Sequence, residues 1–240
     1  MQNTKGNAPM KAAAPDEICF DAYGDLACFS IPALRTEHYS YDVPTPSAIC
    51  GLVKAIYWHP GFDYEAVRCE VINPIQRLSI TQNELSSPCV GSTALRCMKD
   101  GVLMPSVERS EVRQQKSTTF LKDVYYRLTV RIIPRENYSG EEKFDLNKYR
   151  AILTRRLEKG EQFYTPYFGI RECRAFVRKP RVGEEKESFY RGKTLELGTM
   201  LHSIEYVDGP DGTLLNEIPH FYTPIMKDGV IEIPPRKEIY

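Results

Sequence analysis

The segment from Val43 to Pro60 constrains the fold more than any other, because it predicts a helix together with both of its ends. Prolines on either side of Thr45 favour an extended entry, and Thr45 or Ser47 can cap the first turn. Apolar residues then recur every three or four positions, which is typical of a helix with one buried face. We therefore expect a helix over Ser47 to Trp58, stopped by Pro60 and Gly61. The expected apolar face comprises Ala48, Ile49, Leu52, Val53, Ile56 and Tyr57.

Composition places the chain among ordinary globular proteins. It has 240 residues, of which 42% are hydrophobic and 27% are charged, and these values are typical of a domain with its own core. No apolar run approaches the length of a membrane span, and the N-terminus lacks the apolar stretch of a secretory signal. We expect residues 1–15 to form a disordered tail, and we expect no membrane partner.

The seven cysteines include no Cys-x-x-Cys pair and no cluster with histidine at zinc-binding spacing. Several of them, such as Cys19 and Cys69, lie in apolar patterns, where a free thiol behaves as a small hydrophobic group. This usage predicts buried structural thiols in a reducing cytoplasm. We expect no metal site and no cofactor.

Hydrophobic periodicity predicts an α+β fold over residues 16–180. A second helix is expected after a cap at Asp145 or Asn147, with a stop at Gly160. The resulting order, strand-helix-strand-strand-helix-strand, is the ferredoxin-like topology of RRM-like domains. The expected strands are Glu17 to Tyr23 with a turn at Gly24-Asp25 and a continuation near Leu26 to Ile31, then Tyr64 to Ile72, Ile75 to Gln82, Phe120 to Ile133, and Tyr164 to Val177 around a turn at Phe168-Gly169.

The pattern changes to strands alone after about residue 180. Residues 181–240 are expected to form a C-terminal antiparallel β-sheet domain, with strands over 194–207 and 221–233 and a hairpin turn at Lys227-Asp228-Gly229. Residues 83–116 are polar and rich in loop-forming residues. They favour a mobile flap, with a hairpin as the alternative.

Net charge is zero, but its distribution is uneven. Lys148 to Arg181 holds ten basic residues against three acidic ones, and Val107 to Arg135 holds seven against three. The chain from Gly183 onward contains eleven acidic residues and six basic ones. Aromatic residues are interleaved with the arginines of the first segment, as in surfaces on which RNA bases stack. This asymmetry favours a basic face for nucleic acid over an ordinary solvated surface.

Several segments, taken in order, resemble the type I-C (Dvulg-subtype) Cas-five proteins, which are RAMP-superfamily endoribonucleases that cut precursor CRISPR RNA. The helix within Val43 to Pro60 is similar to the first helix of that family. The resemblance covers roughly residues 17 to 207, and its specificity lies in the ordered set. The other matching segments are Phe20 to Phe29, Leu121 to Arg127, Ala151 to Gly160, Tyr167 to Cys173 and Leu197 to His202.

The resemblance implies three catalytic positions. The family uses a tyrosine at the end of the first helix and a lysine-histidine pair at the start of the second, which correspond here to Tyr57, Lys148 and Tyr149. Tyrosine therefore replaces the family's histidine. In this scheme Tyr57 orients or deprotonates the 2′-hydroxyl, Lys148 stabilises the phosphorane, and Tyr149 donates to an oxygen. Because a phenol titrates near pH 10 and an imidazole near pH 6.5, His59 is a candidate for the missing imidazole.

The basic segments supply the expected RNA-binding residues. Arg155 and Arg156 cannot both face the core, so at least one should join the basic face. Arg171 can bind a phosphate through two hydrogen bonds, and Gly169 would let the backbone approach a ligand closely. A simple turn with an Arg171–Glu172 surface pair is the alternative. The predicted RNA-binding residues are Lys122, Arg155, Arg156, Tyr167, Phe168, Arg171 and Arg174.

The resemblance also implies a biological role. Such a protein recognises the CRISPR-repeat stem-loop and cuts at its 3′ base without metal, leaving a 2′,3′-cyclic phosphate and a 5′-hydroxyl. It then stays on the 5′ handle as a subunit of the type I-C interference complex in the cytoplasm. Two alternatives remain open: a non-catalytic subunit that binds the guide-RNA handle, and a general module for double-stranded nucleic acid, including double-stranded DNA.

Overall fold

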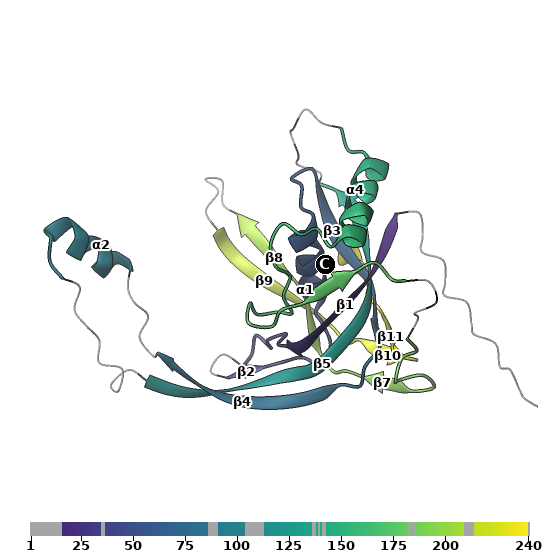
Figure 1. Ribbon diagram of the computed structural model, residues 1–240, viewed down its shortest axis with the longest axis horizontal. Coiled ribbons are helices and arrows are strands. Elements are labelled where there is room, and N and C mark those ends of the chain that lie inside the picture. Colours follow the sequence, from purple (N-terminus) through teal and green to yellow (C-terminus); the bar gives the residue numbers. More distant parts are fainter. Residues whose placement is uncertain are drawn as a thin grey trace, which may run out of the picture.

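The computed structural model describes residues 16–34, 37–85, 91–103, 113–135, 138, 140, 143–181, 183, 186–208 and 214–239. Its centre is a sheet in which four strands lie in the order β6-β1-β5-β3, each antiparallel to its neighbour (Figure 1). Two helices, α1 and α4, pack against these strands and against each other. The elements are β1 (Glu17–Ala27), α1 (Pro46–Ile56), β3 (Phe62–Val71), β5 (Arg113–Pro134), α4 (Leu146–Lys159) and β6 (Phe176–Arg178).

Strand alternation builds the core between this sheet and the helices. Tyr126, Leu128, Val130 and Ile132 of β5 are all buried, as the alternation of this strand predicts. The pairing register places buried residues of β1 and β3 beside them, for example Phe20 opposite Leu128. A β-bulge in β3 between Ala66 and Arg68 keeps the next apolar side chains on the same face.

Both helix ends agree with the sequence patterns. Thr45 caps α1 by accepting a hydrogen bond from the backbone N–H of Ala48, and Asp145 caps α4 in the same way. Gly160 ends α4 with a φ of 70°, in the left-handed region that glycine adopts readily. The predicted end of α1 is wrong by two residues, because the helix stops at Ile56 and Tyr57 is already extended.

β1 is one continuous strand, so the predicted turn at Gly24-Asp25 is wrong. Glycine is required there for a different reason. A Cβ on Gly24 would lie 2.6 Å from the carbonyl oxygen of Arg174, because the segment after α4 crosses close to the strand. That segment is mostly irregular rather than extended, since only Phe176–Arg178 forms a strand. Tyr167 and Arg174 add a single bridge around the predicted turn.

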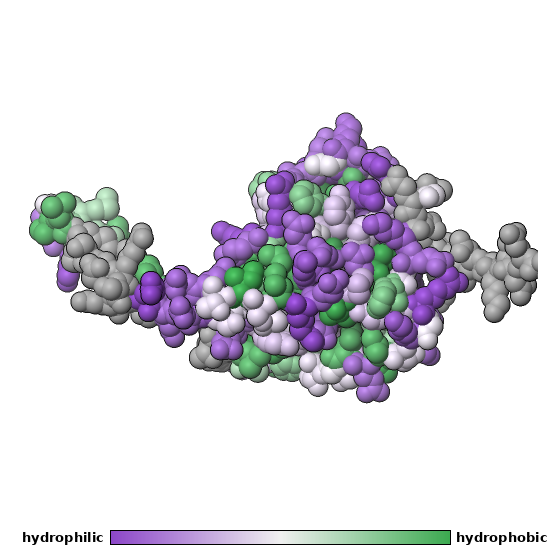
Figure 2. Space-filling model, turned by 60° about the horizontal axis from the view of Figure 1, so that its bottom comes forward, coloured by the Kyte–Doolittle hydropathy of each residue, from purple (hydrophilic) through white to green (hydrophobic). Residues whose placement is uncertain are grey.

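β5 is 22 residues long and extends beyond the rest of the sheet (Figure 1). Its first half pairs with β4 (Gln76–Leu85) to make a two-stranded arm, and α2 (Gly91–Asp100) follows β4 in the chain. The prediction of a loop-like flap over 83–116 is therefore corrected in its described parts, while residues 86–90 and 104–112 lie outside the described residues. No residue of α2 is buried, and Figure 2 shows hydrophobic residues on its surface. The short β2 (His38–Tyr39) pairs with β5 in parallel.

The C-terminal strands extend the central sheet and add a second one. β11 pairs with β3, β10 with β11, and β7 with β10, while β8 and β9 form a separate antiparallel pair. The predicted hairpin turn is confirmed, since Asp228 and Gly229 both have positive φ. Whether residues 181–240 fold as a separate domain stays a prediction. The strands are β7 (Thr194–Glu196), β8 (Met200–Asp208), β9 (Leu214–Tyr222), β10 (Ile225–Lys227) and β11 (Val230–Glu232), followed by a short 3-10 helix at Arg236–Glu238.

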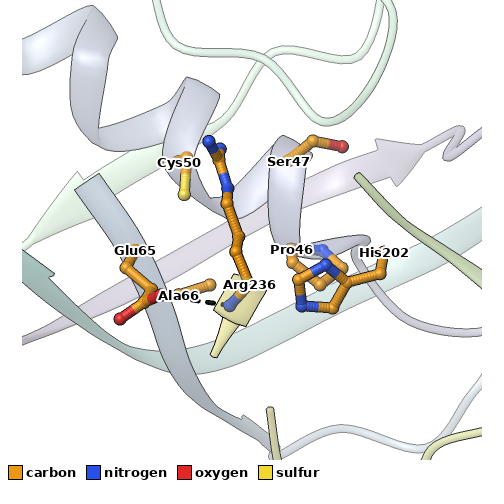
Figure 3. Close-up of a pocket in the computed structure, with 7 residues that line it drawn as sticks. All are labelled: Pro46, Ser47, Cys50, Glu65, Ala66, His202 and Arg236. Atoms are coloured by element: carbon orange, nitrogen blue, oxygen red, sulfur yellow. Dashed lines mark hydrogen bonds between the residues drawn. The ribbon is translucent and has the colours of Figure 1, made fainter. Parts of the chain in front are cut away.

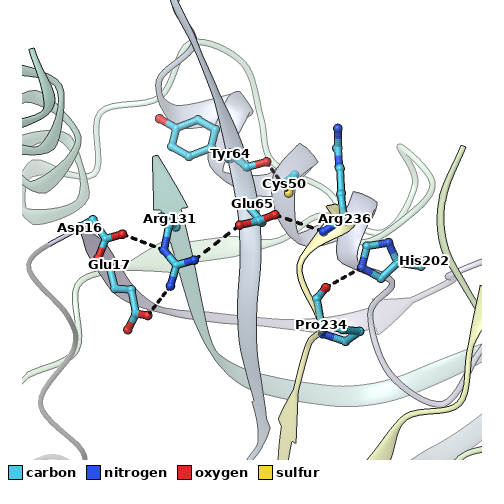
Figure 4. Close-up of polar contacts among 9 residues, drawn as sticks. All are labelled: Asp16, Glu17, Cys50, Tyr64, Glu65, Arg131, His202, Pro234 and Arg236. Atoms are coloured by element: carbon cyan, nitrogen blue, oxygen red, sulfur yellow. Dashed lines mark hydrogen bonds and ion pairs between the residues drawn. The ribbon is translucent and has the colours of Figure 1, made fainter. Parts of the chain in front are cut away.

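A polar network ties the end of the chain to the sheet (Figure 4). The Arg131 side chain of β5 lies between the carboxylates of Glu17 on β1 and Glu65 on β3, at 3.1 and 3.6 Å. Glu65 also accepts a hydrogen bond from the backbone N–H of Arg236. His202 of β8 contacts the carbonyl oxygen of Pro234 at 2.9 Å. These contacts therefore hold the central strands, the C-terminal segment and β8 together.

Candidate active site and nucleic-acid interface

The last carbonyl groups of α1 accept hydrogen bonds from later parts of the chain. Helices leave their last carbonyl groups without partners inside the helix. Here the carbonyl oxygen of Ala55 accepts the backbone N–H groups of Phe163 and Tyr164, at 2.8 and 3.2 Å. That of Ile56 accepts from the Arg156 guanidinium at 2.6 Å. Because these partners come from α4 and the segment after it, the end of α1 is fixed relative to both.

Tyr57 follows this end and is buried, with 8% of its surface exposed. Its carbonyl oxygen accepts a hydrogen bond from the hydroxyl of Tyr64, and its ring lies 4.9 Å below the Arg156 guanidinium carbon. The Arg156 guanidinium thus supports the end of α1, and a role for this half-buried residue in RNA binding stays a prediction. Arg155 is exposed, and whether it joins a basic face for RNA stays a prediction.

Phe62 links the two predicted catalytic tyrosines. Its ring lies 5.6 Å from that of Tyr57 and 4.8 Å from that of Tyr149, measured between centroids. The His59 ring lies 5.1 Å from Tyr149 and stacks on Phe62 at 5.9 Å. We call Tyr57, His59, Phe62 and Tyr149 the ring cluster. The structure therefore brings Tyr57, Tyr149 and the imidazole of His59 into one place.

The members of the ring cluster differ in access to solvent. Tyr149 is only 1% exposed, and the ring of Phe144 packs against it as well. His59 is half-buried, and its Nδ1 accepts the backbone N–H of Gly61 at 3.1 Å. In a neutral imidazole this bond assigns the proton to Nε2. His59 is consequently the member best able to exchange a proton with a bound molecule.

Lys148 lies in the first turn of α4, directly before Tyr149. Its side chain is exposed, and its backbone N–H donates to the Asp145 carboxylate that caps the helix. The N-terminal end of a helix carries a partial positive charge. A lysine at this position adds a full charge one residue before Tyr149, which favours the binding of a phosphate group.

The other predicted RNA-binding residues lie on separate elements, and Lys122 is twelve residues along β5 from Pro134, the partner of Phe62. Arg171 and Arg174 are exposed on the segment after α4, and Arg174 lies over the ring of Phe176 at 5.0 Å. Arg155 lies 3.7 Å from Glu161, so part of its charge is neutralised. Lys122 on β5 is exposed and lies 3.5 Å from Asp123.

Two predictions about the segment after α4 are wrong. Phe168 is fully buried between Phe29 and Tyr126, so it belongs to the core and cannot stack on RNA. Glycine at position 169 is required by a close approach within the protein rather than by an approach to a ligand. A Cβ there would lie 1.9 Å from the carbonyl oxygen of Cys28, and its φ is 81°, so the close approach is to β1 and its continuation. Tyr167, in contrast, is half-buried and borders a cavity.

Sequence patterns missed a row of rings on the sheet face opposite the helices. The Tyr23 ring stacks at 5.6 Å on both Tyr125 and Phe176, which come from the two strands beside β1. Arg178 lies over Tyr23, and its guanidinium contacts the Tyr125 hydroxyl at 3.3 Å. Strand pairing across three separate segments creates this row, and the only local signal is the alternate position of Tyr23 in β1.

Side chains with other possible chemistry are buried or dispersed. Burial raises the pKa of the thiols of Cys19 and Cys50 to about 11.

Among the described residues, no three His, Cys, Asp or Glu side chains are grouped so that they could hold a metal ion. No helix in the described part of the chain is long and apolar enough to cross a membrane. The cavity in Figure 3, between α1, β3 and His202, measures about 10 Å³ and has room for about one water molecule.

Comparison with known proteins identifies relatives along almost the whole chain. Two curated proteins named CRISPR pre-crRNA endoribonuclease Cas5d are each 32% identical to it. The one from Mannheimia succiniciproducens matches over 92% of this chain and 96% of its own length. The one from Thermus thermophilus matches over 91% and 92%.

Solved structures are also similar to this chain along most of its length. A crystal structure titled as a CRISPR-associated protein has a TM-score of 0.65 and 26% identity, covering 93% of this chain and 94% of that one. A functionally uncharacterized protein from Streptococcus mutans has the same TM-score with 27% identity and the same coverage. Residues 17–234 match the family described as CRISPR-associated protein (Cas_Cas5). The chain therefore belongs to the Cas5d branch of the Cas5 family of CRISPR-associated proteins.

Proposed function

We propose that this protein is an endoribonuclease that cuts the repeat stem-loops of precursor CRISPR RNA by attack of a 2′-hydroxyl on the adjacent phosphate. The observation that carries the proposal is the 32% identity, over more than nine-tenths of both chains, to proteins named CRISPR pre-crRNA endoribonuclease Cas5d. An exposed lysine directly before Tyr149 in the chain, together with the clustered rings of His59, Tyr57 and Tyr149, supplies groups suited to this reaction.

We further propose that β1-α1-β3-β5-α4-β6 is a ferredoxin-like domain. The chain order of these elements and the sheet order β6-β1-β5-β3 support this assignment. In such a domain the last turn of the first helix and the first turn of the second can lie at the same end of the strands. Phe62, at the start of β3, contacts Tyr57 directly after α1 and Tyr149 in the first turn of α4, in keeping with that arrangement.

Each group receives a role from its exposure and chemistry. Lys148 binds a phosphate oxygen and stabilises the charge that develops on the phosphorane. His59 exchanges the proton of the reaction, because it is half-buried whereas both tyrosines are buried, and histidine is the most frequent general acid or base. Tyr57 and Tyr149 position the reacting groups, since both are more than nine-tenths buried.

The atoms of this step balance without a cofactor. The 2′-oxygen forms a bond to phosphorus while the bond from phosphorus to the 5′-oxygen breaks. The proton of the 2′-hydroxyl leaves, and the departing 5′-oxygen gains one. The products are a 2′,3′-cyclic phosphate and a 5′-hydroxyl. Retention on the 5′ handle, assembly into the type I-C interference complex and a cytoplasmic location complete the proposal.

The test is incubation of the purified protein with end-labelled cognate repeat RNA in EDTA. We expect one cut, with a 2′,3′-cyclic phosphate on the upstream product. A matched RNA with a single 2′-deoxynucleotide before the cut should bind equally well and stay intact, because it lacks the attacking oxygen. Tight binding of the normal RNA without a cut, at any excess of protein, would instead support a non-catalytic subunit that binds the guide handle.

A further inference from the structure

A cavity of about 350 Å³ lies beside the N-terminal half of α1, away from the ring cluster. This volume is within the range of pockets that bind small molecules, which begins near 300 Å³. The sequence patterns gave no indication of it. Its walls come from α1, from the segments before it and after α4, and from β8. The lining residues are Phe29, Ser30, Thr45, Ser47, Ala48, Gly51, Tyr164, Tyr167, Gly169 and Leu201.

The walls of this cavity are held in place by the backbone. Tyr164 is fixed at one end of its segment by its N–H bond to Ala55. Phe168 is fixed at the other end, where its carbonyl oxygen accepts the N–H of Cys28 at 3.0 Å. On the opposite wall, Thr45 caps α1. The cavity is thus formed in the protein before any ligand binds, which lowers the entropic cost of binding.

Gly51 gives the strongest indication that the space has a use. It lies in the middle of an 11-residue helix, where glycine destabilises by about 0.5–1 kcal/mol relative to alanine. A Cβ at Gly51 would meet no atom within 4 Å, and φ at this residue is not positive. Neither packing nor backbone conformation therefore requires glycine. What glycine preserves here is open volume in the cavity.

The chemistry of the lining favours a nucleobase. None of the lining residues is charged. Tyr164 and Tyr167 offer aromatic rings for stacking, and the hydroxyls of Thr45 and Ser47, 3.1 Å apart, offer hydrogen bonds. Arg171 lies close enough for its charge to oppose the rise in the pKa of Tyr164 that burial causes. Rings and hydroxyls around a base, with a cation for its phosphate, are the usual means of binding single-stranded RNA.

We propose that this cavity binds one unpaired nucleobase of the RNA, turned out of the strand, with Arg171 on the adjoining phosphate. This inference rests on the proposed function, since the RNA is the one that the protein cuts or retains. It adds a recognition site at the opposite end of α1 from the ring cluster. A side chain of a protein partner is the competing occupant.

The test measures equilibrium binding of cognate repeat RNA to variants that fill or strip the cavity. Gly51→Phe should occupy the space and weaken binding on the order of tenfold, the typical loss of one stacked base. Tyr164→Ala should weaken binding as Gly51→Phe does. Its matched control is Phe163→Ala, because Phe163 is 78% exposed and does not line the cavity.

A series of RNAs with one abasic nucleotide each then identifies the bound base. One abasic position should weaken binding to the unchanged protein about tenfold and binding to Gly51→Phe less than twofold. Thermal unfolding confirms that each variant is folded, and the Tyr164→Ala and Phe163→Ala pair decides the question if Gly51→Phe is not. Equal RNA binding by all variants, with no sensitive abasic position, overturns the inference. Failure of the unchanged protein to bind repeat RNA overturns the proposed function as well.

Discussion

The two ends of α1 are built in opposite ways. At the C-terminal end, large rings and the Arg156 guanidinium pack around Tyr57. The last carbonyl groups of the helix accept hydrogen bonds from α4 and from the segment after it. At the N-terminal end, the side facing away from the core carries only Ser47, Ala48 and Gly51, and a cavity of about 350 Å³ remains open. An α-helix of 11 residues is about 16 Å long, so one rigid element separates the two ends.

This contrast teaches how one helix can serve two purposes. Bulk and hydrogen bonds at the C-terminal end give the fixed geometry that proton transfer and charge stabilisation require. Small residues at the N-terminal end give room for a ligand. Variants at the C-terminal end should therefore change cleavage or stability, whereas variants at the N-terminal end should change affinity.

The largest effect is expected at the C-terminal end. Lys148→Ala should lower the single-turnover rate of RNA cleavage by about 10²–10³-fold, because removal of one group that stabilises the transition state typically costs that much. RNA binding should change by less than tenfold. The measurement is cleavage of end-labelled repeat RNA at saturating protein in EDTA. Lys143→Ala, on the exposed segment before α4, is the control and should cleave normally. A Lys148→Ala rate within threefold of the unchanged protein would contradict the role of this lysine.

The next effect concerns the imidazole of the ring cluster. His59→Asn should lower the cleavage rate by about 10²-fold, the lower limit for loss of a general acid or base. The asparagine oxygen can still accept the N–H of Gly61, as Nδ1 of His59 does, so the turn should persist. The measurement is the dependence of the single-turnover rate on pH. We expect the rate to depend less on pH in the variant, because a general acid or base has been removed. An unchanged profile would return the proton transfer to Tyr57 or Tyr149.

Arg156 tests the anchoring of the C-terminal end by stability instead of activity. Arg156→Met keeps much of the side-chain length but removes the hydrogen bond to the Ile56 carbonyl and the charge over the Tyr57 ring. We expect the free energy of unfolding to fall by about 2 kcal/mol, as is typical for a hydrogen bond from a charged group. Urea denaturation measures it. Arg155→Met is the matched control, since Arg155 is exposed and should change stability by less than about 0.5 kcal/mol.

A buried histidine beside the N-terminal end of α1 makes stability depend on pH. His202 is 3% exposed and borders Pro46, and burial lowers its pKa below the usual 6.5. Below pH 6.5 the unfolded chain therefore binds a proton that the folded chain does not. Stability from this residue is fully present above that pH and falls as the pH decreases further, by at most about 1.4 kcal/mol per pH unit.

Comparison of urea denaturation at pH 7.5 and 5.5, for the unchanged protein and for His202→Gln, checks this effect. The variant should lose less stability between the two pH values than the unchanged protein does. Equal losses would show that other groups facing this site, among them Glu65, Arg236 and His220, dominate the response.

Local patterns predicted much of the fold. Caps at Thr45 and Asp145, the stop at Gly160, and the alternation in β5 are each encoded within a few residues, and all were confirmed. The turn expected at Gly24 was wrong because the need for glycine comes from Arg174, which is distant in the chain. A sequence pattern cannot distinguish a glycine needed for a turn from one needed for a close approach.

The candidate site was predictable only in part. Tyr57, Lys148, Tyr149 and His59 were all named from the sequence, and three of them lie in the ring cluster. Their burial could not be predicted, because it depends on Phe62, which bridges segments that are far apart in the chain. Residues around the cavity come from four segments and carry no charge or motif, so no local pattern indicates that they converge.

The smallest effect is expected at Gly51, on the side of α1 that borders the cavity. Gly51→Ala should raise the free energy of unfolding by about 0.5–1 kcal/mol, because alanine is the better helix former and its methyl group meets no atom within 4 Å. Gly24→Ala, where a Cβ would lie 2.6 Å from the Arg174 carbonyl oxygen, should lower it instead. Urea denaturation measures both. A higher free energy of unfolding in Gly51→Ala means that glycine lowers stability at this position and that what it provides is open space. A lower one would mean that glycine stabilises the helix itself, and it would remove the main support for a preformed cavity.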